Sequence, residues 1–555
     1  MARPHHPVIG GRRAARLGTA ALAAVPLLVL VAFFLYPVGG MVARGFWPGG
    51  AFHPGGVWDV LARSRVHRVL WFTVWTAGLA TVLAVVLGVP VAFVLHRLSF
   101  RGQGVLRTLI VVPFVMPTVV AGVAFRELIR TSGPLGGLHL DGTPTAIVAA
   151  LVFFNVSVVV RTVGSFWEGL DRRTEEAAAA LGASPLRVFG TITLPALLPS
   201  VASAASVVFL FCSTSFGIVL TLGGLRYANV ETEIYQLTTQ ELDLQGAAAL
   251  SVLQIVVITA LLVLSHRARR GSPALSRQAR RGRRPRWRDT AVLAWSAVVI
   301  AMLMTPLATL VEASLRSSDG WTLANYRALQ TTGSDDALLV TASSALRNSF
   351  VIALQAAGIA LILGVIVSYL VSRRPRSGAG RRASGLFDGI FMLPLGVSAV
   401  TLGFGFLITL DRPPLDLRTS ELLIPIAQAM VALPLVVRTL APVLTSIDPR
   451  MREAAASLGA GPLRVLAVVD LPHAWRAILA SIGFAFAVSL GEFGATSFLA
   501  RDDSPTLPVV IYDLIGHPGA ANFGMAMAGS VVLAAATGAA MLLVESFRVT
   551  SVGAF

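Results

Sequence analysis

The chain has 555 residues, of which 55% are hydrophobic and only 13% are charged, and its formal net charge is +17. A mean hydropathy of +0.75 excludes an ordinary soluble domain and predicts a protein that lives in a bilayer. All 45 basic residues are Arg. Since a GxxxxGK[ST] phosphate loop needs a Lys, we expect no Walker ATPase site in this chain.

The first predicted element is a membrane anchor near the N-terminus. Residues 17–36 are all uncharged, and they follow a segment that contains Arg3, Arg12, Arg13 and Arg16. Roughly twenty residues reach about 30 Å as a helix, which is the thickness of a bilayer core. A cleaved signal peptide has a shorter apolar core, so we expect the anchor to be retained.

Eleven further apolar stretches follow in chain order, each near the length that crosses a bilayer. With the anchor they predict twelve transmembrane helices, at about 18–42, 69–95, 108–129, 145–166, 200–222, 247–265, 290–313, 347–371, 386–410, 421–442, 474–498 and 524–545. When an Arg at the end of a span is counted with the adjoining loop, placing the N-terminus in the cytoplasm puts 30 Arg inside, 12 outside and 3 within spans. This asymmetry predicts a multi-pass protein of the cytoplasmic (inner) membrane with both termini in the cytoplasm.

An Arg-rich segment, 266–289, separates the sixth predicted span from the seventh and contains ten Arg. It divides the chain into two predicted six-helix halves, 1–265 and 290–555. We interpret the segment as a solvated cytoplasmic linker. A patch for anionic lipid or nucleic acid is the alternative, although we expect no nucleic-acid partner.

The two halves carry an internal repeat. Residues 176–195, EAAAALGASPLRVFGTITLP, align without a gap to 453–472, EAAASLGAGPLRVLAVVDLP, with 13 identities in 20 at a shift of 277. The same shift places Pro117 on Pro394 and Tyr235 on Tyr512. Because equivalent segments lie six spans apart, the halves share one orientation and form parallel repeats about an axis along the membrane normal.

Each repeat centres on E-A-A-x3-G and closes on an I-x-L-P-like ending. The residues up to Leu181 are good helix formers, Gly182 is placed to end that helix, and Pro185 prevents its continuation. We therefore predict a short helix, a sharp turn and a second short amphipathic piece on the Arg-rich side. The residues alone leave two interpretations open: a docking segment for a partner, or a helix lying on the bilayer.

These segments resemble the EAA loop of binding-protein-dependent ABC importer permeases. The resemblance implies an all-α integral membrane protein with the type I ABC importer permease fold, which has no enzymatic activity of its own. It also implies coupling helices that dock on two copies of a cytoplasmic ATP-binding subunit, and an extracytoplasmic solute-binding protein that delivers a small-molecule cargo. The residues that the resemblance assigns to ATPase coupling are Glu176, Ala177, Ala178, Gly182, Glu453, Ala454, Ala455 and Gly459.

Fused permeases of this length form a group that serves thiamine and ferric iron. Two stretches, LTLGGLRYANVETEIYQ at 220–236 and SLGEFGATSFLARDDSPTLPVVIYDLIG at 489–516, look closer to the thiamine permease. We expect the cargo to be thiamine or a related small cationic solute, with ferric iron as the alternative. An ion-coupled secondary transporter would also show twelve spans and a repeat, but it would not need EAA loops.

Glu492 is an ionisable residue inside an apolar run, where a charge is costly and tends to face a cavity. We assign it to a possible cargo path, and the alternative is a carboxylate at a helix break that Ser489 or the backbone satisfies. The acidic loop residues Glu231, Glu233, Glu241 and Asp243 fall on the predicted outer face, as ordinary solvated side chains or as guides for a cation. We find no catalytic motif, cofactor motif or metal-ligand spacing.

Overall fold

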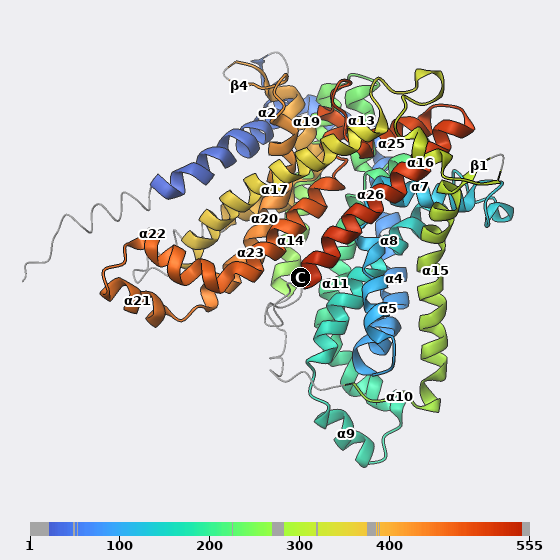
Figure 1. The fold of residues 1–555 in the computed structure, drawn as a ribbon, viewed down its shortest axis with the longest axis vertical. Helices are drawn as coiled ribbons and strands as arrows, with labels where there is room; N and C mark the ends of the chain where they lie inside the picture. The colour runs from blue at the N-terminus through green and yellow to red at the C-terminus, as the bar shows by residue number, and fades with distance from the viewer. Residues whose placement is uncertain are drawn as a thin grey trace, which may run out of the picture. The chain divides into compact units, whose positions relative to one another are not determined.

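The computed structural model describes residues 21–47, 50–52, 54–224, 226–268, 282–317, 320–373, 385, 387, 389–413 and 415–546. Their regular structure is helical apart from two short antiparallel hairpins, which confirms the predicted all-α fold (Figure 1). Among these residues, the helices long and apolar enough to cross a bilayer are Ala21–Phe46, Ser64–Arg97, Pro144–Glu168, Pro185–Ser213, Leu244–Val263, Trp287–Ser314, Ala342–Ser372, Leu423–Ser446, Leu463–Leu490 and Ala520–Val544.

The predicted span 108–129 is a bent pair of helices, Gln103–Val115 and Thr118–Ile129, which meet at 100°. Met116 precedes Pro117 and is held extended (φ −61°, ψ 141°), because the proline ring excludes a helical neighbour. The carbonyl of Ile110 is freed near this break and accepts the hydroxyl of Ser157. Pro117 therefore marks a sharp bend in this span, and the bent pair supplies an eleventh span.

The place of the ninth predicted span, 386–410, holds shorter elements. Residues 386 and 388 lie outside the described part of the chain, and the rest contains η8 (Leu393–Gly396) and α19 (Ala399–Thr409). Pro394 lies within η8 and is the repeat counterpart of Pro117. A proline interrupts the third span of both halves.

Two compact units make up the chain, and their membership differs from the two sequence halves. Unit 2 contains residues 42–349 and 500–538, whereas unit 1 contains 350–499 with the described residues up to 41 and from 539 onward. The seventh span thus packs with the helices of the first half, and the first span with those of the second. Because both repeats offer similar apolar faces, this exchange cannot be predicted from the hydropathy pattern.

Unit 2 holds the helices of the first half. Its elements are α3 (Pro54–Leu61), α4 (Ser64–Arg97), α5 (Gln103–Leu109), α6 (Val112–Val115), α7 (Thr118–Ile129), η3 (Gly136–Leu138), α8 (Pro144–Glu168), α9 (Arg173–Ala180), α10 (Pro185–Val188), η4 (Phe189–Thr193), α11 (Leu194–Ser213), α12 (Gly217–Gly223), α13 (Val230–Thr239), α14 (Leu244–Ala268), η6 (Trp287–Asp289), α15 (Thr290–Ser314), β1 (Arg316–Ser317), β2 (Gly320–Trp321), α16 (Ala324–Ala328), η7 (Ser334–Asp336) and α25 (Leu507–Gly516). Helix α4 packs on α8, α11 and α15.

Unit 1 holds most helices of the second half. Its elements are η1 (Val31–Leu35), η8, α19, β3 (Asp411–Arg412), β4 (Leu415–Asp416), α20 (Leu423–Ser446), α21 (Pro449–Ser457), α22 (Pro462–Val465), η9 (Leu466–Asp470), α23 (Leu471–Leu490) and α24 (Thr496–Leu499). Three helices have residues in both units: α2 (Tyr36–Phe46), α17 (Ala342–Ser372) and α26 (Ala520–Ser546).

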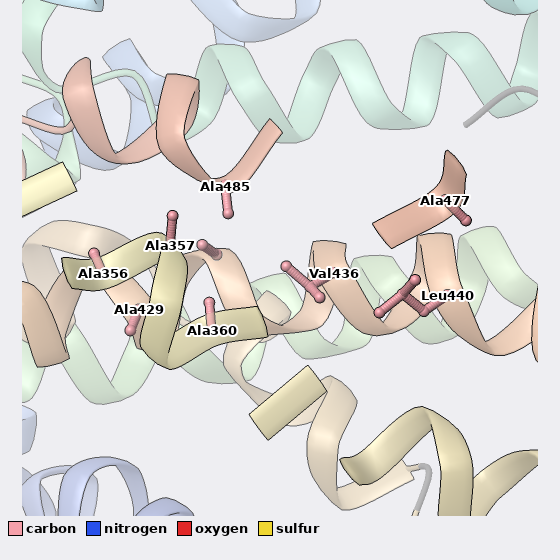
Figure 2. Packing of buried hydrophobic residues seen from close by; sticks show 9 residues of the cluster. Ala356, Ala357, Ala360, Ala429, Val436, Leu440, Ala477 and Ala485 are labelled. Carbon is pink, nitrogen blue, oxygen red and sulfur yellow. The ribbon is translucent and has the colours of Figure 1, made fainter. Parts of the chain in front are cut away.

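Small side chains let the spans of each unit approach closely. In unit 1, Ala356, Ala357 and Ala360 of α17 pack against α20 and α23 in one buried cluster (Figure 2). Helices in a bilayer associate by close packing rather than by exclusion of water, so small residues mark their contacts. A Cβ added to Gly364 would overlap Cγ1 of Val436, which shows how tight the contact is.

The same contacts recur in the two halves. A Cβ on Gly88 would lie 2.9 Å from Cβ of Val159, as one on Gly364 would meet Val436. The hydroxyl of Thr73 accepts the amide of Val230 at 3.1 Å, and the hydroxyl of Ser349 accepts the amide of Leu507 at 2.8 Å. In each pair the partners from α4 and α17 are related by a shift of 276 and the others by 277. The second half therefore has one residue more than the first half between its second span and its third.

Candidate functional site

The first repeated segment folds as a short helix that ends at a left-handed glycine. Helix α9 has no buried residue, and Gly182 follows it with φ +87°. The amide of Gly182 donates to the Ala179 carbonyl at 3.0 Å, and that of Ala183 to the Ala178 carbonyl at 3.1 Å. This is a Schellman motif, whose left-handed position favours glycine. The predicted helix end is confirmed.

The second segment has the same cap. Helix α21 begins at Pro449 and has no buried residue, and Gly459 follows it with φ +84°. Gly459 donates to the Ala456 carbonyl and Ala460 to the Ala455 carbonyl, both at 3.0 Å. The two segments thus share their hydrogen bonds as well as their sequence.

The second piece of each segment differs from the prediction. Helix α10 continues through the π-helix η4 into α11, so Pro185–Ser213 is one uninterrupted span. Pro185 stands at the first turn, where a missing N–H costs nothing, and therefore starts the helix. The matching helix of unit 1 runs over Leu463–Leu490. Each exposed helix is therefore joined by a short turn directly to a membrane span.

The π-helices have a common cause. Helix η4 ends two residues before Pro195, and η9 ends two residues before Pro472. A proline inside a helix has no N–H and its ring clashes with the carbonyl four residues earlier, and a π-turn relieves both. The L-P ending of the motif thus marks a built-in irregularity at the start of the span.

The residues that the sequence assigned to coupling lie on the outside of both segments. Helix α9 extends beyond α10 at the end of unit 2, and α21 lies beside α22 at the end of unit 1 (Figure 1). One alanine in each helix is half-buried, and Ala455 packs on the cluster of Leu444 and Val465. The half-buried members of the set are Ala178 and Ala455, and the exposed members are Glu176, Ala177, Gly182, Glu453, Ala454 and Gly459.

Four leucines on the same surfaces were missed by the sequence reasoning. Leu181 and its counterpart Leu458 are each 89% exposed, and Leu186 and Leu463 are 84% and 74% exposed. A single exposed leucine has no special meaning, but these four form an exposed apolar surface at matching positions of the two repeats. The occurrence of leucine at the same two positions of both repeats was the sequence signal from which they could have been predicted.

Glu492 lies at the break between α23 and α24 and is 7% exposed. Its carboxylate accepts the Ala495 amide at 2.7 Å, the Thr496 amide at 3.1 Å and the Thr496 hydroxyl at 2.6 Å. The backbone and Thr496 satisfy the carboxylate, whereas the Ser489 hydroxyl has no hydrogen-bond partner among the described residues. This is the geometry of a helix cap, and the cargo role of Glu492 stays a prediction.

Two of the acidic loop residues are not solvated, contrary to that interpretation. Glu231 and Glu233 of α13 are 0% and 1% exposed. Gln254 donates to Glu231 at 2.5 Å, and Nε of Arg65 lies 2.7 Å from Glu233. Burial raises the pKa of Glu233, and Arg65 offsets part of that rise. The loop folds back as a helix against α4 and α14, which places polar side chains inside the protein.

The end of the Arg-rich linker is ordered against the first half. The amide of Ser99 donates to the Arg283 carbonyl at 2.8 Å, and the amide of Arg283 to the Arg97 carbonyl at 3.1 Å. The Arg283 guanidinium in turn donates to both carboxylate oxygens of Asp289 at 2.6 and 2.7 Å. Residues 282–289 are therefore fixed to α4 and do not form a free tether, while 269–281 lie outside the described residues.

Comparison with known proteins decides the family. The family model described as "Binding-protein-dependent transport system inner membrane component" matches this chain twice, at residues 84–270 and 360–549. The chain belongs to this family of permeases. A permease of this family is not an enzyme, since separate subunits of the transporter hydrolyse ATP. The family also works with a solute-binding protein and lies in the inner membrane.

Relatives of this permease resemble it along most of its length or along one half. The thiamine transport system permease protein ThiP of Salmonella typhimurium is 27% identical over 83% of this chain and 86% of its own. The ThiP protein of Brucella abortus is 27% identical over 92% and 90%. The molybdenum transport system permease protein ModB of Mycobacterium bovis is 32% identical over 44% of this chain and 92% of its own. The last match covers about one half of the fused permease.

Proposed function

We propose that this permease carries thiamine, or a related small cationic solute, into the cytoplasm. Relatives named as thiamine permeases match more than four fifths of the chain at 27% identity. The stretches at 220–236 and 489–516 support the same cargo. Glu492, near the end of the fifth span of the second half, would favour a cation if the path passes beside it.

The coupling surface carries the mechanistic part of the proposal. Helices α9 and α21 are exposed, capped by the same glycine motif, and joined directly to a span. We infer that each docks on one ATP-binding subunit, so that two copies bind one permease. Apolar contacts from Leu181 and Leu458 would be buried there, with Glu176 and Glu453 as charged contacts. Both helices and both termini then lie in the cytoplasm.

Uptake by cells with and without the gene tests the cargo. Labelled thiamine uptake should fall to background in the deletion strain, and labelled ferric iron uptake should stay unchanged. Loss of iron uptake with normal thiamine uptake would assign the alternative cargo. Uptake that persists after deletion of the ATP-binding subunit but disappears with a proton uncoupler would indicate a secondary transporter instead.

A further inference from the structure

An ion cluster stands behind each exposed coupling helix, and it occupies equivalent positions in the two halves. The first position is the end of the second span, which is Arg97 in the first half and Arg373 in the second, related by the shift of 276 that α4 and α17 share. The second position is on the coupling helix and holds Glu175 in the first half and Arg452 in the second. The third is in the π-helix and holds Thr193 and Asp470; the second and third positions are both related by the shift of 277. None of these residues belongs to the E-A-A-x3-G pattern.

In the first half the acid is on the coupling helix. Glu175 pairs with Arg97 and accepts the hydroxyl of Thr193 at 3.0 Å. The side chain of Arg97 is only 6% exposed, and its Nη1 also donates to the Trp167 carbonyl at 3.4 Å, at the end of α8. The cluster therefore joins α9 to α4, α8 and the start of α11.

In the second half the acid is in the π-helix and the coupling helix carries an arginine. Asp470, whose side chain is 1% exposed, lies 2.6 Å from Nε of Arg452 and 2.8 Å from Nη2 of Arg373. Arg452 also donates to the Leu444 carbonyl at 2.6 Å, at the end of α20. Leu444 is the repeat counterpart of Trp167. The same four elements are joined, but the acid has changed places.

We propose that these two ion clusters are positioning elements that transmit the movement of each coupling helix to the membrane spans. The inference rests on the proposed docking function. Neither helix has a buried residue, and the half-buried residues of α9 and α21 are the cluster members Glu175 and Arg452 together with Ala178 and Ala455. A buried charge that loses its partner is strongly destabilising, so each cluster holds its helix in one place. The retained geometry with an exchanged acid indicates that the connection is required and the residue order is not.

The chain supplies its own rescue design. Glu175→Arg replaces the acid with a further positive charge beside Arg97, which already feels the charges of Arg172 and Arg283, and should release α9. Adding Thr193→Asp copies the arrangement of the second half, Arg-Arg-Asp, into the first half and should fix α9 again. Where Glu175→Arg does not accumulate, Glu175→Gln removes the charge without adding repulsion.

Spin labels read the position of α9 without cargo or ATPase. The single cysteine, Cys212, is buried and is replaced by Ser, and labels are placed at the exposed residues Leu181 and Val105, the latter on α5. Electron–electron distances are measured on the permease in nanodiscs. We expect a narrow distribution for the parent, a broad one for Glu175→Arg, and a narrow one for the double variant. A single variant as narrow as the parent, or a double variant as broad as the single, would overturn the proposal.

Transport by the full complex provides a second measurement on the same variants. In proteoliposomes with the ATP-binding subunit and the binding protein, thiamine taken up per ATP should fall roughly tenfold in Glu175→Arg and return to within about twofold in the double variant. Glu312→Arg breaks an exposed ion pair with Arg316 and should leave the ratio unchanged. If the parent moves no thiamine, the proposed cargo fails while the label distances still decide the positioning role. If the parent transports thiamine and Glu175→Arg takes up as much thiamine per ATP, the positioning role of the ion clusters is refuted and the proposed cargo is not.

Discussion

Replacing Gly282 by Ala tests how the linker is fixed to the first half. A Cβ at this position would lie 2.5 Å from the Leu98 carbonyl oxygen and 2.6 Å from its carbonyl carbon. These are backbone atoms, which cannot rotate away as a side chain would. The linker and α4 must separate, and the hydrogen bonds of Arg283 to Ser99 and Arg97, at 2.8 and 3.1 Å, are lost.

The size of the effect follows from those two bonds. Each contributes about 1 kcal/mol, so about 2 kcal/mol of local stability is lost, which is roughly a 30-fold change in the opening equilibrium. Amide hydrogen exchange measures it directly, and the Ser99 and Arg283 amides should exchange about 30-fold faster.

Gly104→Ala is the matched control, on α5 of the same unit. No atom lies within 4 Å of its added Cβ, and Ala favours a helix over Gly by up to about 1 kcal/mol. Exchange of Ser99 should not accelerate in the control. Unchanged exchange in Gly282→Ala would show that residues 282–289 do not dock on α4.

Three further predictions concern packing, pH and the helix cap. Gly364→Ala should lower the thermal stability in detergent by about 1–3 kcal/mol, and Val436→Ala in the same chain should restore part of it, since it removes the overlapping methyl; no recovery would refute the contact. Burial raises the pKa of Asp513 to about 6 from 3.8, with His517 lowering it in part, so the folded state binds a proton more tightly than the unfolded chain. The free energy of unfolding should therefore fall by up to about 3 kcal/mol as the pH rises from 4 to 7. In Asp513→Asn, a series of melting curves at different pH should show a weaker dependence of stability on pH. An unchanged dependence would contradict the prediction. Gly182→Ala forces a side chain into the left-handed region at about 1 kcal/mol, so binding of the ATP-binding subunit should weaken about fivefold by titration, and equal affinity would show that the cap does not shape the docking surface.

Much of the fold was predictable because the bilayer imposes length and composition. Long apolar stretches gave eleven of the twelve spans, counting the bent pair as one. The repeated E-A-A-x3-G pattern gave both exposed helices and their glycine caps, because a left-handed residue favours glycine. The break at Pro117 also has a local cause, since a proline excludes a helical residue before it.

The remaining features depend on contacts that no local pattern records. Burial of Glu231 follows from a loop that folds back on α14, although its acidic composition is typical of solvated residues. The cluster at Asp470 could not be recognised from the repeat, because the equivalent residue of the first half is Thr193 and the two sequences differ at this position. Arg97 and Arg373 were missed for a related reason, since they align only at a shift of 276 and the rest of the repeat aligns at 277.

The central claim is that α9 and α21 connect this permease to ATP hydrolysis, and the double variant Glu176→Lys, Glu453→Lys tests it most directly. We measure ATP hydrolysis by the assembled complex with and without cargo-loaded binding protein, beside Glu421→Lys as a charge control on an exposed residue outside both helices. The account predicts that stimulation disappears in the double variant while the protein still inserts, and that the control keeps it. Full stimulation in the double variant would contradict the account.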